Sequence, residues 1–268
     1  MHFTLDDRQA YAYTGGRPLD PALPGLVFIH GALADHSVWG LQSRYLAHHG
    51  HAVMALDLPG HGRSAGPALD VPSAGAWVVR AVLAAGLQRV ALVGHSMGSL
   101  IALEAAAALG ERASHLVMVG TAYPMKVSAA LLEMSRDQVL KAIDLVNNLS
   151  ISSHACKPSA PGPGFSLHGV NRALMRRNQA QYTSGNLFLH DFQACDAYDG
   201  LAQAASRLRC PVTLVLGSRD QMTAPRAAAA LVDALKPRVV TLPSGHTLMS
   251  EVPDALLETL KAALSDPH

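Results

Sequence analysis

Short runs of consecutive apolar residues recur along the first half of the chain and predict buried strands. These runs lie at residues 26–29, 52–56, 89–93 and 115–119. Two shorter segments before them, at residues 3–5 and 9–13, predict a hairpin. The segments that follow the apolar runs have a helix-forming composition, at residues 37–49, 71–85 and 99–109. Strands that alternate with helices favour βαβ units, so we expect a parallel sheet covered by helices on both faces.

The alternation stops after residue 121 and resumes at residue 206. Strand candidates return at residues 211–216 and 239–242, with helices expected at 223–235 and 253–264. We therefore expect an α/β core domain formed by residues 1–121 and 206–268. Residues 122–205 are then an insertion at the carboxyl end of a strand, where ligands bind in such sheets.

The inserted segment has a helical pattern. Ser135 and Gln138 resemble a capping box that opens a helix, with Val139, Ile143 and Val146 on one face. Further helices are expected at residues 170–181 and 185–197, after a loop rich in Pro and Gly at 157–164. We expect residues 122–205 to form a helical cap that excludes water and shapes a substrate pocket.

The pentapeptide 94–98, Gly-His-Ser-Met-Gly, is the most informative motif in the chain. It lies between a predicted strand and a predicted helix, which is the context of a nucleophilic serine on a sharp turn. A glycine- and serine-rich turn that merely opens a helix is the alternative. The strand before and the helix after favour Ser96 as the nucleophile.

A nucleophilic serine needs a base, and the base needs an acid to orient it. Asp220 follows the strand expected at 211–216, and His246 follows the strand expected at 239–242. Each has a plainer interpretation, because Asp220 could be a helix N-cap and His246 a loop histidine. Their joint position at consecutive strand ends predicts a triad of Ser96, Asp220 and His246.

The chain resembles the α/β-hydrolase superfamily, whose lidded members include carboxylesterases, lactonases, C–C bond hydrolases and serine haloperoxidases. The matching stretches span nearly the whole chain: His30-Gly31-Ala32, residues 57–64, 94–98 and 217–220, and Gly245-His246. The resemblance implies a mostly parallel eight-stranded sheet with helices on both faces and an inserted helical cap. It also implies an oxyanion hole formed by the backbone N–H groups of Ala32 and Met97.

Several other positions in or near these stretches are expected to have structural roles. His30 and His95 are expected to connect loops by hydrogen bonds. Asp57 is expected to anchor a loop, with Arg63 as its candidate partner, and Trp39 is expected to pack in the interior. Ser99 replaces a glycine often found after the motif, and the sequence supplies no account of its effect.

The leading functional hypothesis is hydrolysis of a carboxylic ester through an acyl-enzyme on Ser96. A lactonase or a C–C bond hydrolase using the same triad is an alternative. Thr247, where the latter usually have Trp, disfavours the C–C reaction, while the cap residues Arg172, Arg176 and Arg177 keep an acidic substrate open. A ligand-binding protein with a vestigial triad is the alternative of another class.

The substrate pocket is expected to include apolar residues of the cap, namely Met125, Phe188, Phe192 and Cys195. Their character suggests an apolar acyl or alcohol group. The alternative is that they only pack the cap against the core domain.

Composition narrows the remaining possibilities. Charged residues make up 15% of the chain and the net charge is +1, which argues against nucleic acid and against a polybasic membrane segment. Three cysteines (Cys156, Cys195 and Cys210) without metal-binding spacing favour a reducing compartment, and no signal peptide is recognised at the N-terminus, so a cytoplasmic location is expected. We expect no metal and no cofactor, a small ester-like substrate, no membrane partner, and a monomer or homodimer.

Overall fold

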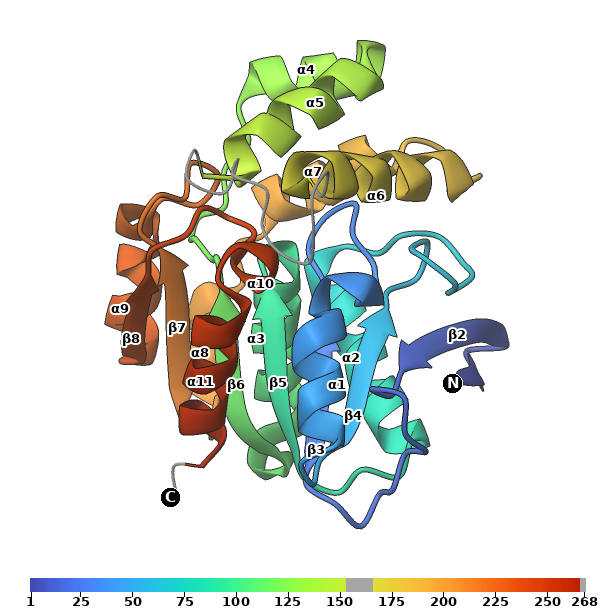
Figure 1. Cartoon of the computed structure of the whole chain (residues 1–268), viewed down its shortest axis with the longest axis vertical. Helices are drawn as coiled ribbons and strands as arrows, with labels where there is room; N and C mark the ends of the chain where they lie inside the picture. Colours follow the sequence, from blue (N-terminus) through green and yellow to red (C-terminus); the bar gives the residue numbers. More distant parts are fainter. Residues whose placement is uncertain (153–165, 266–268) are drawn as a thin grey trace.

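One eight-stranded sheet organises the residues that the computed structural model describes, 1–152 and 166–265. The strand order is β1-β2-β4-β3-β5-β6-β7-β8 (Figure 1). The strands are β1 (His2–Leu5), β2 (Arg8–Tyr13), β3 (Gly25–Ile29), β4 (Ala52–Asp57), β5 (Val90–His95), β6 (Ala113–Val119), β7 (Val212–Gly217) and β8 (Arg238–Leu242). β1 pairs antiparallel with β2, and β2 with β4; all other pairs are parallel. The expected mostly parallel sheet is confirmed.

Helices cover both faces of the sheet, because the strand residues point alternately to the two sides. Leu26 and Phe28 of β3 pack with α1 (Gly40–Ala47) and α11 (Pro253–Leu264) on one face. Val27 and Ile29 of the same strand pack with the helices of the other face. Those helices are α2 (Val71–Ala84), α3 (Met97–Leu109), α8 (Leu201–Arg207) and α9 (Ala229–Leu235). Short helices η1 (His36–Trp39), η2 (Gly110–Arg112), η4 (Pro225–Ala228) and α10 (Leu248–Glu251) complete the core.

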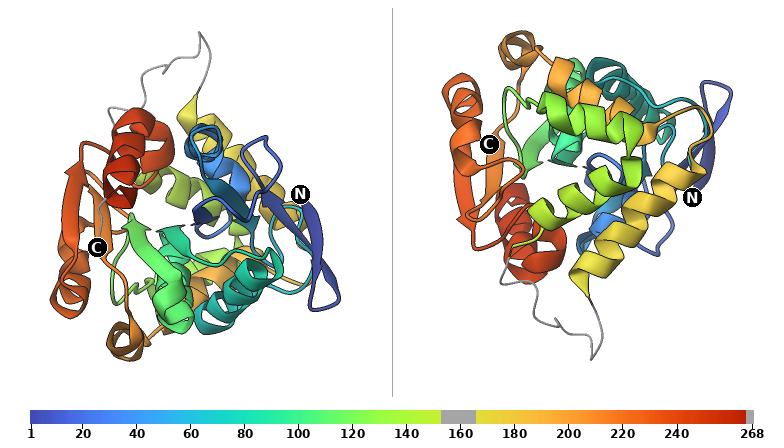
Figure 2. Two further views of the ribbon diagram at one scale, coloured as in Figure 1. Left: turned by 90° about the horizontal axis from the view of Figure 1, so that it is seen from below. Right: turned by 90° about the horizontal axis from the view of Figure 1, so that it is seen from above.

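The insertion after β6 is helical, as expected. It comprises α4 (Ala129–Asp137), α5 (Val139–Ser150), α6 (Leu167–Gln181), α7 (Leu187–Ala197) and then α8. Helices α4 to α7 lie across the carboxyl end of the sheet, above the strand arrowheads in Figure 1 and over the core in the right-hand view of Figure 2. They have a small hydrophobic core of their own that includes Ile143, Phe188 and Phe192 and reaches Leu33 of the core domain.

Two expectations about the helices need correction, and one helix was not expected at all. Ser135 does not open a helix: it lies inside α4, and its Oγ donates to the carbonyl of Leu132 at 2.7 Å. Ser128 is the N-cap of α4, because its side chain accepts from the N–H of Leu131. The helix expected at 223–235 divides into η4 and α9, and α8 was not foreseen. Ile143 and Val146 are nevertheless buried on one face of α5, as predicted.

Cys156 and the predicted loop 157–164 lie outside the described residues. No helix of the described ranges combines the length and the apolar character that a membrane crossing requires.

Candidate active site

Ser96 lies on the sharp turn between β5 and α3, in a conformation that few L-residues adopt. Its φ is +52° and its ψ is −122°. Close packing around the turn explains the two flanking glycines. A Cβ on Gly94 would lie 2.1 Å from the Gly98 carbonyl oxygen, and one on Gly98 would lie 2.3 Å from the His30 carbonyl oxygen. The motif therefore uses glycine at both positions because the backbones approach too closely for any side chain.

Ser99 has a clear role that the sequence did not reveal. Its Oγ donates to the Ser96 carbonyl at 2.5 Å and lies 2.7 Å from the Oγ1 of Thr121, just beyond the end of β6. The N–H of Ser96 in turn donates to the Val119 carbonyl at 2.9 Å. These bonds hold the strained turn from both sides.

Asp220 and His246 meet as the sequence predicts. Nδ1 of His246 lies 2.8 Å from Oδ2 of Asp220, and both residues are buried. Asp220 also accepts the N–H of Met222, the N–H of Thr223 and the Oγ1 hydroxyl of Thr223, each at 2.8 Å. Burial favours the neutral acid, but the adjacent His246 and the Thr223 hydrogen bonds hold the pKa of Asp220 below its usual value. Asp220 thus orients His246 and also closes its own turn.

The loop that carries His246 is held by residues that no motif pointed to. The N–H of His246 donates to the Ser150 carbonyl of the cap at 2.8 Å. Glu251 accepts from the N–H of Gly245 at 3.1 Å, from Oγ1 of Thr247 at 3.0 Å and from Oγ of Ser152 at 2.6 Å. Glu251 therefore connects the histidine loop to the cap.

His30 and His95 act as ties between loops, as expected. Nε2 of His95 donates to the His246 carbonyl at 2.9 Å. Nδ1 of His30 donates to the Gly31 carbonyl at 2.8 Å, and Nε2 of His30 accepts the N–H of Leu58 at 3.1 Å. Burial, together with the neighbouring His61, lowers the pKa of His30 to about 4. Burial, together with the neighbouring His246, lowers the pKa of His95 to about 3. Both rings are neutral near pH 7 and carry no charge to the site.

The predicted oxyanion donors both belong to backbone next to Ser96. Met97 is the first residue of α3, and first-turn N–H groups have no partner within their helix. Ala32 belongs to the loop after β3, which lies against Ser96: a Cβ on Gly31 would be 3.2 Å from Cβ of Ser96. Their assignment to an oxyanion hole remains a prediction.

A cavity of about 250 Å³ joins these parts and extends beneath the cap. Ser96, His246 and Ala32 line it, together with Met125, Phe192 and Cys195 of the predicted pocket. Further apolar walls come from α4, α5 and α6: Leu131, Val146, Leu149, Leu174 and Met175.

The fourth predicted pocket residue, Phe188, does not line the cavity. It is fully buried and stacks on Phe192, with ring centroids 4.3 Å apart and an interplanar angle of 9°. Positions 188 and 192 are one helical turn apart, so Phe188 supports the cavity wall from behind.

The cap arginines do not line the cavity either. Arg176 pairs with Asp144 at 2.9 Å, and Arg177 pairs with Asp35 at 2.6 Å. Arg172 is exposed to solvent. The walls formed by the described residues are therefore mainly apolar, with Lys126 as the cationic contributor.

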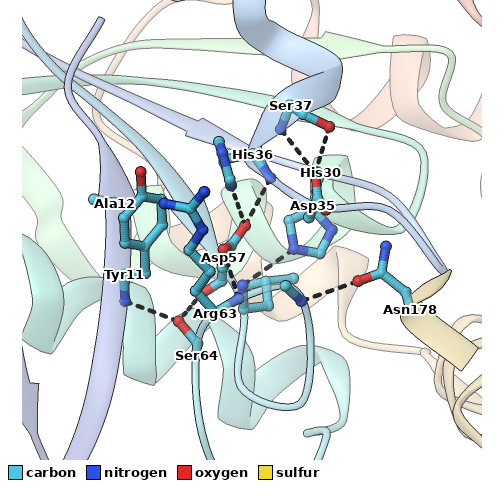
Figure 3. A network of polar contacts seen from close by, with 12 residues as sticks. Tyr11, Ala12, His30, Asp35, His36, Ser37, Asp57, Arg63, Ser64 and Asn178 are labelled. Carbon is cyan, nitrogen blue, oxygen red and sulfur yellow. Dashed lines mark hydrogen bonds and ion pairs between the residues drawn. The ribbon is translucent and has the colours of Figure 1, made fainter. Parts of the chain in front are cut away.

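Asp57 anchors its loop as expected, although the guanidinium of Arg63 is not its partner. The carboxylate accepts the N–H and Nδ1–H of His36 and the backbone N–H of Arg63 (Figure 3). The guanidinium of Arg63 instead lies over the Tyr11 ring, 4.6 Å from its centroid. A candidate metal site lies nearby, since the ligand atoms of Asp35, His36 and Asp57 are within 4.8 Å of one another. Nδ1 of His36, however, is protonated and donates a hydrogen bond to Asp57, so it is not free to bind a cation.

Comparison with known proteins identifies the family and the fold of the chain. Residues 26–259 match the Alpha/beta hydrolase family. A pimeloyl acyl-carrier-protein methyl ester esterase of Aliivibrio fischeri is 26% identical over 254 residues, which cover 90% of this chain and 93% of that protein. A non-heme chloroperoxidase of Streptomyces lividans is 28% identical over 278 residues, covering 97% of both chains. The solved structure of an esterase from Exiguobacterium antarcticum has a TM-score of 0.81 at 19% identity and covers 98% of this chain and 97% of its own, which shows a shared fold.

Proposed function

Since the chain belongs to the alpha/beta hydrolase family, we propose that it hydrolyses a carboxylic ester with an apolar acyl or alcohol group. One observation carries the proposal. Ser96 and His246 line the same apolar cavity, and Asp220 holds Nδ1 of His246 at 2.8 Å. A serine on a strained turn, beside an oriented imidazole and an apolar pocket, is suited to acyl transfer.

In the proposed reaction, Oγ of Ser96 attacks the ester carbonyl while Nε2 of His246 takes the hydroxyl proton. The N–H groups of Ala32 and Met97 stabilise the oxyanion of the tetrahedral intermediate. Collapse of the intermediate breaks the C–O bond, and His246 passes its proton to the departing alkoxide. A water then gives a proton to His246 and attacks the acyl carbonyl. The bond between the acyl carbon and Oγ of Ser96 breaks, His246 returns the proton to Oγ, and the acid is released.

The composition of the cavity supports a neutral substrate. The carboxylate groups of an acidic substrate need cationic partners when they are buried. Arg176 and Arg177 are already paired with Asp144 and Asp35, away from the cavity. Lys126 lines the cavity, but its side chain is largely exposed to water and its ammonium already donates to the Asp196 carbonyl at 2.6 Å. This weakens the C–C hydrolase alternative that the cap arginines had kept open. A lactone is a cyclic ester and fits the same chemistry, so a lactonase is a variant of this proposal.

The test measures covalent labelling and ester turnover on the wild type and on Ser96→Ala. We expect one fluorophosphonate adduct by intact mass on the wild type and none on the variant. We expect p-nitrophenyl butyrate turnover to fall at least about 10³-fold in the variant. Equal turnover by the two proteins would contradict the proposal. An unlabelled, folded wild type that binds butyrate esters without turnover would favour the binding-protein alternative.

A further inference from the structure

Leu33, the residue after the predicted oxyanion donor Ala32, has a backbone conformation that leucine rarely adopts. Its φ is +54°, in the left-handed region, and its side chain is fully buried. Two cap side chains engage its backbone. Its N–H donates to Oδ2 of Asp191 on α7 at 2.9 Å, and its carbonyl accepts from Nδ2 of Asn178 on α6 at 3.2 Å. The strained loop is therefore held from the cap.

Three consecutive peptide groups of this loop are each fixed by a side chain. Nδ1 of His30 donates to the carbonyl of Gly31, in the same peptide group as the N–H of Ala32. The next group is held by Asp191 at the Leu33 N–H, and the third by Asn178 at the Leu33 carbonyl. Because peptide groups are planar, these bonds leave the Ala32 N–H little freedom to turn.

Asp191 is suited to this role because it is a buried charge with a fixed partner. Its Oδ2 also lies 2.9 Å from Nε2 of His61, and both side chains are almost completely buried. Nδ1 of His61 faces the Pro59 carbonyl at 3.1 Å, so both ring nitrogens face acceptors and both donate. This geometry favours the imidazolium form of His61. Burial opposes its charge, but Asp191 raises the pKa of His61 above its usual value.

Asn178 connects the other cap helix, α6, to a second loop of the core. Its Oδ1 accepts the N–H of Gly62 at 3.0 Å, while its Nδ2 donates to Leu33 (Figure 3 shows its side chain directed at the 57–64 loop). The neighbouring Arg177 pairs with Asp35 at 2.6 Å, two residues beyond Leu33. Helices α6 and α7 thus contact the loop after β3, residues 30–35, at several points.

Building on the proposed function, we propose that Asp191 is a positioning residue that, with Asn178, sets the Ala32 N–H toward the substrate carbonyl. Asp191 does not line the cavity, so it acts through Leu33 rather than on the substrate. A movement of α6 and α7 away from the core would remove both supports. The oxyanion hole is then complete only when the cap is seated, which couples catalysis to cap closure.

The experiment compares Asp191→Ala and Asn178→Ala with the wild type, with Asp191→Asn as the conservative variant. Asp144→Ala is the matched control, because it removes a cap carboxylate that pairs with Arg176 at the surface. The readouts are kcat and KM for p-nitrophenyl butyrate, and inhibition by butylboronic acid. The boronate forms a tetrahedral adduct on serine whose oxygen occupies the oxyanion hole, so its affinity reports the geometry of that hole.

We expect Asp191→Ala to lower kcat at least about tenfold and to weaken boronic acid binding by a similar factor, because an oxyanion donor is worth about 10²- to 10³-fold. KM should stay within about twofold, since ground-state binding is unchanged. Asp191→Asn, whose Oδ1 still accepts the Leu33 N–H, should recover most of the loss, and Asp144→Ala should match the wild type.

A folded Asp191→Ala protein with wild-type kcat and boronic acid affinity, or with a change in KM alone, would overturn the positioning role. If Asp191→Ala fails to fold, Asn178→Ala decides by the same two readouts, because that substitution keeps the His61–Asp191 pair intact and leaves no buried charge without a partner. A wild type without ester turnover would contradict the proposed function instead. The rates of fluorophosphonate labelling of the same proteins would then decide the positioning role, since the phosphonyl oxygen occupies the same hole.

Discussion

The buried pair of His61 and Asp191 predicts a large loss of stability when only one partner is removed. His61→Leu leaves the Asp191 carboxylate in the interior with the Leu33 N–H as its remaining donor within hydrogen-bond distance. The side chains of the pair are only 2% and 1% exposed, so water cannot replace the imidazolium. Breaking a buried pair of this kind costs about 3–5 kcal/mol.

For a chain of this size, that loss corresponds to a fall in Tm of roughly 6–20 °C. The matched variant is the double substitution His61→Leu with Asp191→Asn. The asparagine Oδ1 still accepts the Leu33 N–H and the buried charge is gone, so we expect a cost within about 1–2 kcal/mol of the wild type. Urea unfolding followed by circular dichroism measures both. A loss below about 1 kcal/mol for His61→Leu alone would show that the carboxylate is not a buried, paired charge.

The same pair makes stability depend on pH in a defined direction. Burial opposes ionisation of Asp191, but the charge of His61 and the hydrogen bonds to the carboxylate lower the pKa of Asp191 below its unfolded value of 3.8. The contribution of Asp191 to stability is therefore present above pH 3.8 and is lost as the pH falls further. His61 has a raised pKa, so its contribution is complete below its unfolded value of 6.5 and is lost as the pH rises through the folded value. Three further titratable groups face the pair and also affect the pH dependence of stability: His30, Asp57 and His190.

The stability difference between the wild type and the double variant should therefore be largest between about pH 4 and pH 6.5. It should shrink on both sides of that range. Urea titrations at several pH values measure it, and a difference that grows from pH 7 to pH 9 would contradict an ion pair at this position.

Two further substitutions test the site from other sides. Glu251→Ala removes the acceptor shared by the N–H of Gly245 and the hydroxyl of Thr247. We expect kcat to fall roughly 10- to 100-fold with little change in KM, because His246 is then less well positioned. A wild-type kcat would show that the His246 loop keeps its conformation without Glu251. Phe192→Ala opens the cavity wall and should shift the preferred p-nitrophenyl ester to longer acyl chains, at a stability cost of about 3–5 kcal/mol. An unchanged chain-length profile would show that Phe192 does not bound the acyl group.

The fold and the positions of the three predicted triad residues followed from local features of the amino-acid sequence. Buried strands are continuous apolar runs, and their alternation with helical segments dictates a parallel sheet. Parallel strands end at one edge, so Ser96, Asp220 and His246 could be placed near each other from their positions after strands. The requirement for glycine at positions 94 and 98 could also be predicted, because a turn that tight excludes side chains.

Local patterns were less informative inside the cap. The capping-box interpretation of Ser135 was wrong because a serine inside a helix can satisfy its hydroxyl on a preceding carbonyl, here that of Leu132. The pattern also could not separate Phe192, which lines the cavity, from Phe188, which stands behind it. Helical spacing shows that two residues share a face, but the packing of that face decides which one meets the cavity.

Only the tertiary structure showed how the catalytic loops are supported. Asp191 meets Leu33 across 158 residues of chain, and Glu251 meets Ser152 across 99. Neither acid lies in a motif, since a hydrogen bond needs only a suitable atom about 3 Å away and leaves no periodic trace in the sequence. The sequence determined the chemistry that we propose for the chain, because that chemistry depends on residue type and strand order. The orientation of its donors was decided by contacts between the cap and the core, which exist only after the chain has folded.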